Sequence, residues 1–245
     1  MTSEDPQPVS DTTALIAALA RRPGPALAYS GADGALELTG RVCANWAYKG
    51  ASLLAEAGVG PDCALLIVVP PAGYLHWRAL LAALSAAALG APVRLARPSA
   101  EPPDGPHAAL APEALAEAAA TAGADELFVY AEAPLALAAE APAETRDYNA
   151  EIRAHPDVVA LAPQGSIEFS APDSPPTSAP VPAPAPGAVE LAGWPRDAAE
   201  AGRAFAALAG GLLSTADAPG TGAPAESGPP GAPDVGHATI GAWTK

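Results

Sequence analysis

Histidine and lysine are the first residue types to consider for chemistry, because they bind metals, transfer protons and contact phosphates. The four histidines are far apart in the sequence, and none has a cysteine or carboxylate at zinc-ligand spacing; they are His76, His107, His155 and His237. The only lysines are Lys49 and Lys245. These residues therefore indicate no metal site, and they offer few candidates for chemistry on a phosphate or acyl phosphate.

His76 is the one histidine that we keep as a candidate for a site. It follows the apolar run Ala64–Val69 (ALLIVV) by seven residues, and open α/β sheets bind ligands at the carboxyl ends of their strands. We therefore name Pro71, Gly73, Tyr74 and His76 as the rim of a candidate ligand cleft. The helical angle of His76 points away from the apolar stripe of its predicted helix, which favours a solvent-facing side chain over a catalytic one.

Sequence motifs for nucleotide binding and for hydrolysis are missing. No Gly-x-Gly-x-x-Gly opens a helix after a strand, no Gly-Lys-Ser/Thr occurs, and no Gly-x-Ser-x-Gly elbow is found. His155, within His-Pro-Asp, is interpreted as the end of a short helix that begins near Asp147. The residues themselves thus predict no catalytic residue and no cofactor.

The elements that must position the candidate rim form a strand-helix-strand unit. Ala64–Val69 reads as a strand buried on both faces, an Ala/Leu-rich helix follows up to Leu89, and a second strand covers Pro92–Ala96. Leu127–Ala131 (LFVYA) predicts another strand. The fold class is therefore α/β, with three layers and a mostly parallel sheet joined by right-handed crossovers.

Two further elements are predicted ahead of this unit. Asp33-Gly34 is a hairpin signal between the strands Ala26–Ser30 and Ala35–Leu38. Thr39 can then cap a helix that runs to about Ala57. Gly50 lies on the buried side of that helix, which indicates a strand passing close beneath it.

Composition divides the chain into segments. The 30 Pro and 23 Gly cluster late, and Ala171–Gly187 (APDSPPTSAPVPAPAPG) predicts a polyproline II spacer of roughly 45 to 55 Å. The expected segments are a disordered 1–11, an α/β domain over 12–162, a Pro-rich linker over 163–187, a small strand-helix unit over 188–214, and a disordered tail over 215–245.

Charge and cysteine content limit the partners and the compartment. A net charge of −15 repels phosphate backbones and anionic lipids, so we expect neither nucleic acid nor a membrane as a partner. The amino-terminal MTSEDPQP lacks the features of a signal peptide, and the cytosol is the expected location. Cys43 and Cys63 are interpreted as core thiols without a disulfide.

The order of motifs from Pro25 to Leu95 resembles the N-terminal region of the adenylate-forming superfamily, which includes acyl-CoA synthetases, luciferases and the adenylation domains of peptide synthetases. The matching stretches are PALAYS, LTGRVCANWAYKGASLLAEAGVGPDCALLIVVPP and WRALLAALSAAALGAPVRL. Within them, Gly58–Asp62 matches the residues of that superfamily at the end of a helix, and Gly90–Val93 matches those just before a strand. The resemblance implies the fold of that region.

A closer resemblance is to a family of uncharacterised actinobacterial proteins that are similar to this N-terminal part alone. It spans about residues 12–160 and rests on Glu37–Arg41 (ELTGR), Ala44–Trp46 (ANW), Lys49, Leu53–Leu54, Glu151–Arg153 (EIR) and Pro156–Asp157.

The sequence departs from full adenylating enzymes at every catalytic motif. Those enzymes have a Ser/Thr/Gly-rich loop ending Thr-Gly-x-Pro-Lys that holds ATP phosphates, a Tyr-x-x-Thr-Glu-type motif, an aspartate on the ribose and a C-terminal lysine. None of these is found here, and the Ala/Pro-rich tract stands where the phosphate loop would fall. No ATP-binding residue carries over.

Three functions are consistent with the sequence. The first is a non-adenylating binding or accessory module whose partner is an unknown protein or small molecule. The second is a small-ligand enzyme, for a nucleotide, CoA or acyl compound, that uses the cleft at the strand ends with Tyr74 and His76 at its rim. The third is an interaction protein that acts through its proline tract, although no basic residue flanks a Pro-x-x-Pro motif there.

Overall fold

The computed structural model describes residues 10–31, 34–70, 75–98, 103–191 and 193–216. The predictions made for 1–9, for Pro71, Gly73 and Tyr74, and for 217–245 lie outside these residues. The α-helices are α1 (Thr12–Ala20), α2 (Gly40–Glu56), α3 (Trp77–Ala88), α4 (Ala116–Ala119), α5 (Tyr148–Ala154) and α6 (Ala198–Gly210).

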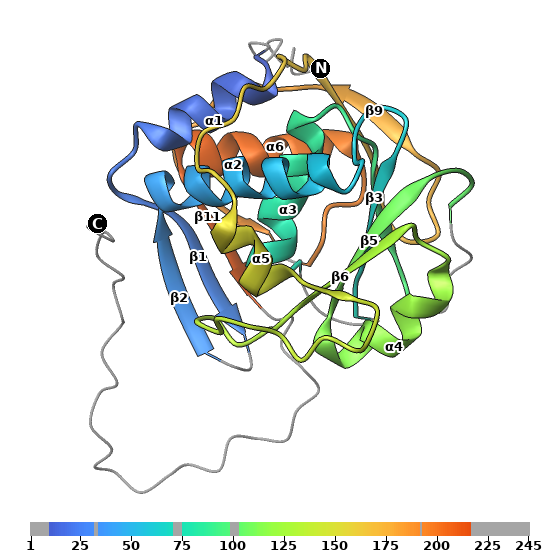
Figure 1. Ribbon diagram of the computed structural model, residues 1–245. Helices are drawn as coiled ribbons and strands as arrows, with labels where there is room; N and C mark the ends of the chain where they lie inside the picture. The colour runs from blue at the N-terminus through green and yellow to red at the C-terminus, as the bar shows by residue number, and fades with distance from the viewer. Residues whose placement is uncertain (1–9, 32–33, 71–74, 99–102, 192, 217–245) are drawn as a thin grey trace, which may run out of the picture.

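The strands form two sheets, with α2, α3 and α6 between them (Figure 1). The first sheet has the order β10 (Ala188–Leu191), β11 (Leu212–Ala216), β1 (Pro25–Gly31) and β2 (Gly34–Thr39). The second has the order β7 (Arg146–Asp147), β6 (Glu126–Tyr130), β5 (His107–Pro112), β3 (Ala64–Val68), β4 (Val93–Ala96), β8 (Ser166–Ser170) and β9 (Thr177–Pro180). In the second sheet every pairing is parallel except that of β8 with β9, which confirms the predicted mostly parallel α/β fold.

The predicted strand-helix-strand unit is β3, α3 and β4. All 12 residues of α3 are buried, because the helix contacts α1 and α2 as well as the strands β3 and β4. The apolar stripe that the sequence indicates on this helix is therefore only part of its packing surface. Helix α3 is the centre of the core.

Predictions made from short sequence signals are confirmed for the elements around this strand-helix-strand unit. Strands β1 and β2 form the predicted antiparallel hairpin, and the Thr39 hydroxyl accepts a hydrogen bond from the amide of Val42 at 3.3 Å, as expected of an N-cap. Strand β6 matches the predicted Leu127–Ala131. Strand β5, between β3 and β6, is a strand that we did not predict.

The expectation that a strand lies beneath Gly50 is wrong. A β-carbon at Gly50 would lie 2.5 Å from the hydroxyl oxygen of Ser85 and 3.4 Å from that of Tyr148. Ser85 belongs to α3, and its hydroxyl donates to the carbonyl of Leu81 at 2.7 Å and approaches that of Ala47 at 3.0 Å. Gly50 thus permits the close approach of helix α3 to helix α2.

The polyproline spacer expected over 171–187 is also wrong. Thr177–Pro180 forms strand β9, which pairs with β8 at the edge of the second sheet, where a proline removes no hydrogen bond that the ladder needs. Val181 is 1% exposed, and the amide of Ala185 donates to the carbonyl of Ala206 in α6 at 2.9 Å. This tract is part of the packed structure.

Glycines of α6 explain why an Ala/Pro tract can lie there. A β-carbon at Gly202 would lie 3.1 Å from Pro182, and one at Gly210 would lie 2.6 Å from the amide nitrogen of Ala185. The tract therefore rests directly on the helix backbone. After α6 the chain enters β11, between β10 and β1, so Thr215 and Ala216, expected in a disordered tail, end a strand.

We predict that Gly50→Ala destabilises the fold. The substitution improves helix propensity by about 1 kcal/mol, but the new methyl group collides with Ser85, and overpacking typically costs about 1 to 3 kcal/mol. Urea denaturation should show a net loss of stability. Gly50→Ala should cost less stability when it is added to Ser85→Ala than when it is added to the wild type, because the colliding hydroxyl is then absent. A gain in stability from Gly50→Ala in the wild type would contradict this packing.

We predict that a chain ending at Pro163 does not fold cooperatively, whereas a chain ending at Ala216 does. The shorter chain lacks β11, the parallel neighbour of β1, and also α6, which contacts strands of both sheets. Circular dichroism during thermal unfolding distinguishes the two. A cooperative transition in the shorter chain would show that residues 164–216 are an appendage.

Candidate functional site at the carboxyl ends of the strands

Of the four predicted rim residues, only His76 lies within the described part of the chain. Its side chain is 3% exposed, so the prediction of a solvent-facing histidine is wrong. The reason is its position, because His76 is the N-cap of α3 and has extended backbone angles, φ −56° and ψ 143°. A helical angle deduced from sequence periodicity does not apply to a residue outside the helix.

Both ring nitrogens of His76 are engaged. Nδ1 accepts a hydrogen bond from the amide of Arg78 at 3.2 Å, which leaves Nε2 to donate to the carbonyl of Glu132 at 3.0 Å. The ring stacks on Tyr130, with centroids 5.0 Å apart, and meets Tyr29 edge-on at the same distance. The imidazole therefore joins α3 to β1 and to the end of β6.

Burial, and to a smaller extent the positive charge of Arg78, lowers the pKa of His76 to about 3, although the hydrogen bond to Glu132 acts in the opposite direction. At neutral pH the ring is uncharged. A neutral ring with both nitrogens bonded is a structural group in this arrangement.

Arg78 is the principal residue of this site that sequence reasoning missed. It is 2% exposed, and its guanidinium donates to four backbone carbonyls at 2.8 to 3.2 Å, those of Ala131, Ala133, Pro134 and Ala136. The carbon of the guanidinium lies 4.4 Å from the ring centroid of Trp77. Burial lowers the pKa of Arg78 to about 10, so the group stays charged at neutral pH.

The carbonyls bound by Arg78 belong to the connection that follows β6. Asn149 of α5 adds a further bond, since its side-chain amide donates to the carbonyl of Ala136 at 3.1 Å. Among the described residues, the carboxyl end of β6 is thus covered by the buried side chains of His76 and Arg78 and by this connection. The sequence signal that could have drawn attention to Arg78 is a single charged residue in a mostly apolar helix that follows a buried strand.

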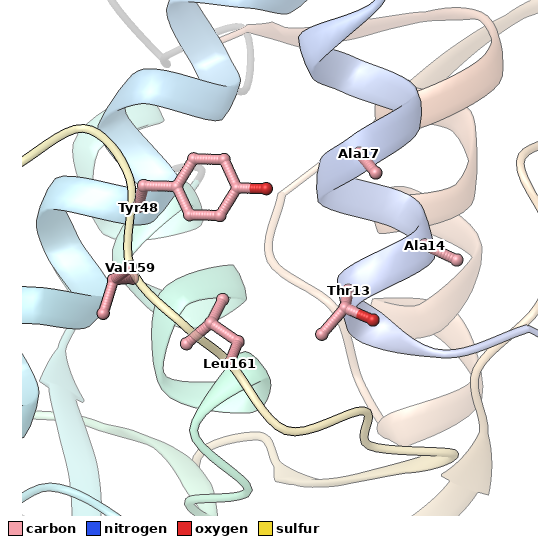
Figure 2. A pocket seen from close by; sticks show the side chains of 6 residues that line it. All are labelled: Thr13, Ala14, Ala17, Tyr48, Val159 and Leu161. Atoms are coloured by element: carbon pink, nitrogen blue, oxygen red, sulfur yellow. The ribbon is translucent and has the colours of Figure 1, made fainter.

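A shallow groove lies elsewhere, between α1, α2 and the segment 159–161 (Figure 2). It has a volume of about 330 Å³ and is lined by Thr13, Ala14, Ala17, Tyr48, Val159 and Leu161. Figure 2 shows the Tyr48 ring pointing across it toward α1. Two hydroxyls are the only side-chain polar groups in this lining, so the groove has no acid-base or nucleophilic pair.

The remaining candidates for chemistry also have structural contacts. The His107 ring lies within 3.2 Å of the carbonyls of Gly105 and Ala122. His155 ends α5, as predicted, and its Nδ1 lies 3.1 Å from the Ser52 hydroxyl. No three His, Cys, Asp or Glu side chains of the described ranges lie where they could hold a metal ion.

Lys49 also makes structural contacts, and neither cysteine forms a disulfide. The Lys49 ammonium donates to the carbonyls of Arg153 and His155 at the carboxyl end of α5, a favourable place for a cation. Cys43 and Cys63 are free, and burial raises the pKa of Cys43 to about 12, so this thiol is unreactive. No helix in the part that the structure describes is long and apolar enough to cross a membrane.

No protein-family profile matches the chain, and no curated protein matches it. Several solved structures do match the chain. An acyl-CoA synthetase from Brucella canis superposes with a TM-score of 0.60 and 17% identity, over 88% of this chain and 44% of its own. Acetoacetyl-CoA synthetase from Streptomyces lividans gives 0.59 and 14%, over 84% and 38%. An amide bond synthetase from Marinactinospora thermotolerans gives 0.53 and 17%, over 84% and 42%.

At these identities the likeness is one of fold. The chain spans about two fifths of the length of these enzymes. The resemblance to acyl-CoA synthetases deduced from the sequence is thereby confirmed as a partial likeness of fold. The resemblance to the actinobacterial family stays a prediction.

Proposed function

We propose that the chain is a binding or accessory module that has part of the adenylate-forming fold and does not catalyse adenylation. The observation that carries the proposal is the connection between β8 and β9, residues 171–176. From the sequence resemblance we expect the phosphate-holding loop of full adenylating enzymes to fall at the Ala/Pro-rich tract, which begins with these residues.

That connection is poorly suited to hold a triphosphate. Pro172, Pro175 and Pro176 have no backbone N–H to donate. The amide of Ser174 already donates to the carbonyl of Ala171 at 3.2 Å. Asp173 adds a carboxylate, which repels phosphate, although its oxygen lies 3.0 Å from Arg97. These six residues therefore present few donors and a negative charge.

The contacts of His76 argue against the second candidate, a small-ligand enzyme with His76 at its rim. A general base must reach the proton that it removes and must have a pKa near the working pH. The His76 ring is buried, and both of its nitrogens are bonded within the protein. Its role is to fix the start of α3 against β6.

The contacts of the proline tract argue against the third candidate. Val181 is buried, and residues 182–185 are half-buried against α6. A segment that is packed in this way does not offer the accessible polyproline helix that recognition domains require. Ala171 and Val181 of the tract belong to the buried residues, whereas residues 173–178 form an exposed connection and strand.

We predict that the purified chain shows no ATP–pyrophosphate exchange with a panel of carboxylic acids, because residues 171–176 cannot hold the phosphates. We also predict no thermal shift with MgATP. A ligand present at 100 times its Kd would stabilise the fold by about 2.7 kcal/mol, which is readily seen. An active acyl-CoA synthetase assayed in parallel serves as the positive control, and exchange by this chain above the blank would overturn the proposal.

A second prediction concerns the pH dependence of stability. Since folding lowers the pKa of His76 from 6.5 to about 3, the unfolded chain binds the extra proton between these values. Stability should therefore fall as the pH falls through this window, with a contribution of up to about 1.4 kcal/mol per pH unit from this residue.

The variant His76→Phe isolates this contribution. The carboxylates titrate in both proteins, so the difference between their unfolding free energies at pH 4 to 8 reports the histidine alone. The wild type should be the more stable protein at pH 8, where the two hydrogen bonds of His76 are intact, and its advantage should shrink steadily below about pH 6.5. A constant difference across the range would mean that His76 is accessible to protons in the folded state.

A further inference from the structure

The connection from Ala131 to Ala141, which we call the 131–141 loop, places two large apolar side chains in solvent. Leu135 is 59% exposed and Leu137 is 61% exposed. In the described part of the chain only Val158 and Val189 are comparable large apolar residues. The two leucines are two positions apart in one loop, whereas the two valines lie on separate segments.

The backbone of this loop is held from the inside. Arg78 binds the carbonyls of residues 131, 133, 134 and 136, and Asn149 binds that of residue 136 as well. The amide of Ala136 closes a turn onto the carbonyl of Ala133 at 3.0 Å, and the Glu113 carboxylate accepts the amide of Glu140. Leu135 and Leu137 are thus displayed on a fixed backbone, which lowers the entropy lost on binding.

The surroundings of the two leucines are acidic. No lysine or arginine occurs between Arg97 and Arg146, and the loop and the residues just after it contain Glu132, Glu140 and Glu144. Glu140 and Glu144 are exposed. A segment that combines two exposed leucines with carboxylates as its only charged side chains complements an apolar depression rimmed by cationic side chains.

We propose that the 131–141 loop is the contact surface for a protein partner that offers an apolar depression ringed by lysine and arginine. The inference rests on the proposed function, since it names the partner class of the binding module. A second copy of this chain is a poor occupant because the whole chain carries a net charge of −15. Nucleic acid is a poor occupant for the same reason.

The test is a selection of random displayed peptides on the immobilised full chain, with counter-selection on the variant Leu135→Gln/Leu137→Gln. Both positions are exposed, so the variant keeps the core. We expect enriched peptides that combine apolar residues with lysine or arginine. Enrichment of peptides without basic residues, or no enrichment at all, overturns the proposal.

Binding of a synthetic selected peptide is then measured by fluorescence anisotropy. Leu135→Gln/Leu137→Gln should weaken binding at least tenfold, and the matched control Val158→Gln should leave it unchanged. Glu140→Gln/Glu144→Gln should weaken binding and reduce its dependence on salt. The proposal is overturned if the leucine variant binds the peptide as tightly as the wild type does. It is also overturned if light scattering shows that the wild type is a dimer and the leucine variant is a monomer.

The absence of adenylation and the docking surface can be disproved independently of each other. ATP–pyrophosphate exchange together with leucine-dependent peptide binding removes only the proposed absence of adenylation. Absence of exchange together with leucine-independent binding removes only the docking surface.

Discussion

The buried guanidinium of Arg78 is the interaction on which the arrangement of the strand ends depends. A charge of this kind is costly to bury unless its donors are satisfied. Here no carboxylate within the described ranges forms an ion pair with it. Four carbonyls accept hydrogen bonds from Nη1 and Nη2, and the group lies over the Trp77 ring, while the buried Nε has no hydrogen-bond partner among the described residues. Because carbonyls have fixed positions along the backbone, satisfying Arg78 requires one conformation of residues 131–136.

Close approach of backbones is the second constraint on the core. Alanine has little surface to bury, so an Ala-rich chain gains stability mainly by bringing its elements near to one another. Gly50 permits this between α2 and α3, and the glycines Gly202 and Gly210 permit it between α6 and the proline tract. The same composition that suggests a loosely packed chain thus allows the close packing seen here.

The sequence predicts best where the signal is local. Ala64–Val69, the Asp33-Gly34 hairpin and the Thr39 cap each depend on neighbouring residues, and the structure has the corresponding elements in place. Strand β5 was missed because its residues, HAALAP, lack the β-branched side chains that mark a buried strand. Strand β9 was missed because the prolines in and around it favour a spacer locally, whereas its pairing with β8 is visible only in three dimensions.

The candidate site was also predicted incompletely, because contacts between residues far apart in the sequence determine it. Sequence position leads us to expect His76 at the carboxyl end of the strand before it, and the structure places its ring on Tyr130 at the end of β6. The orientation of the ring depends on whether the residue caps the helix or lies within it. Arg78 was overlooked because its four acceptors are more than fifty residues away. Backbone carbonyls at such separations have no signature in the sequence.

Covering the strand ends and displaying the leucines are two results of one interaction. Each carbonyl of residues 131–136 that turns inward to Arg78 fixes the backbone on both sides of it, and Leu135 and Leu137 are left facing solvent. Arg78 is thus buried beside the carboxyl end of β6, and two of the exposed large apolar side chains of the described residues lie in the loop that it binds. The docking surface proposed above lies on this loop, and the carboxylates of the loop and of the residues just after it favour a cationic partner.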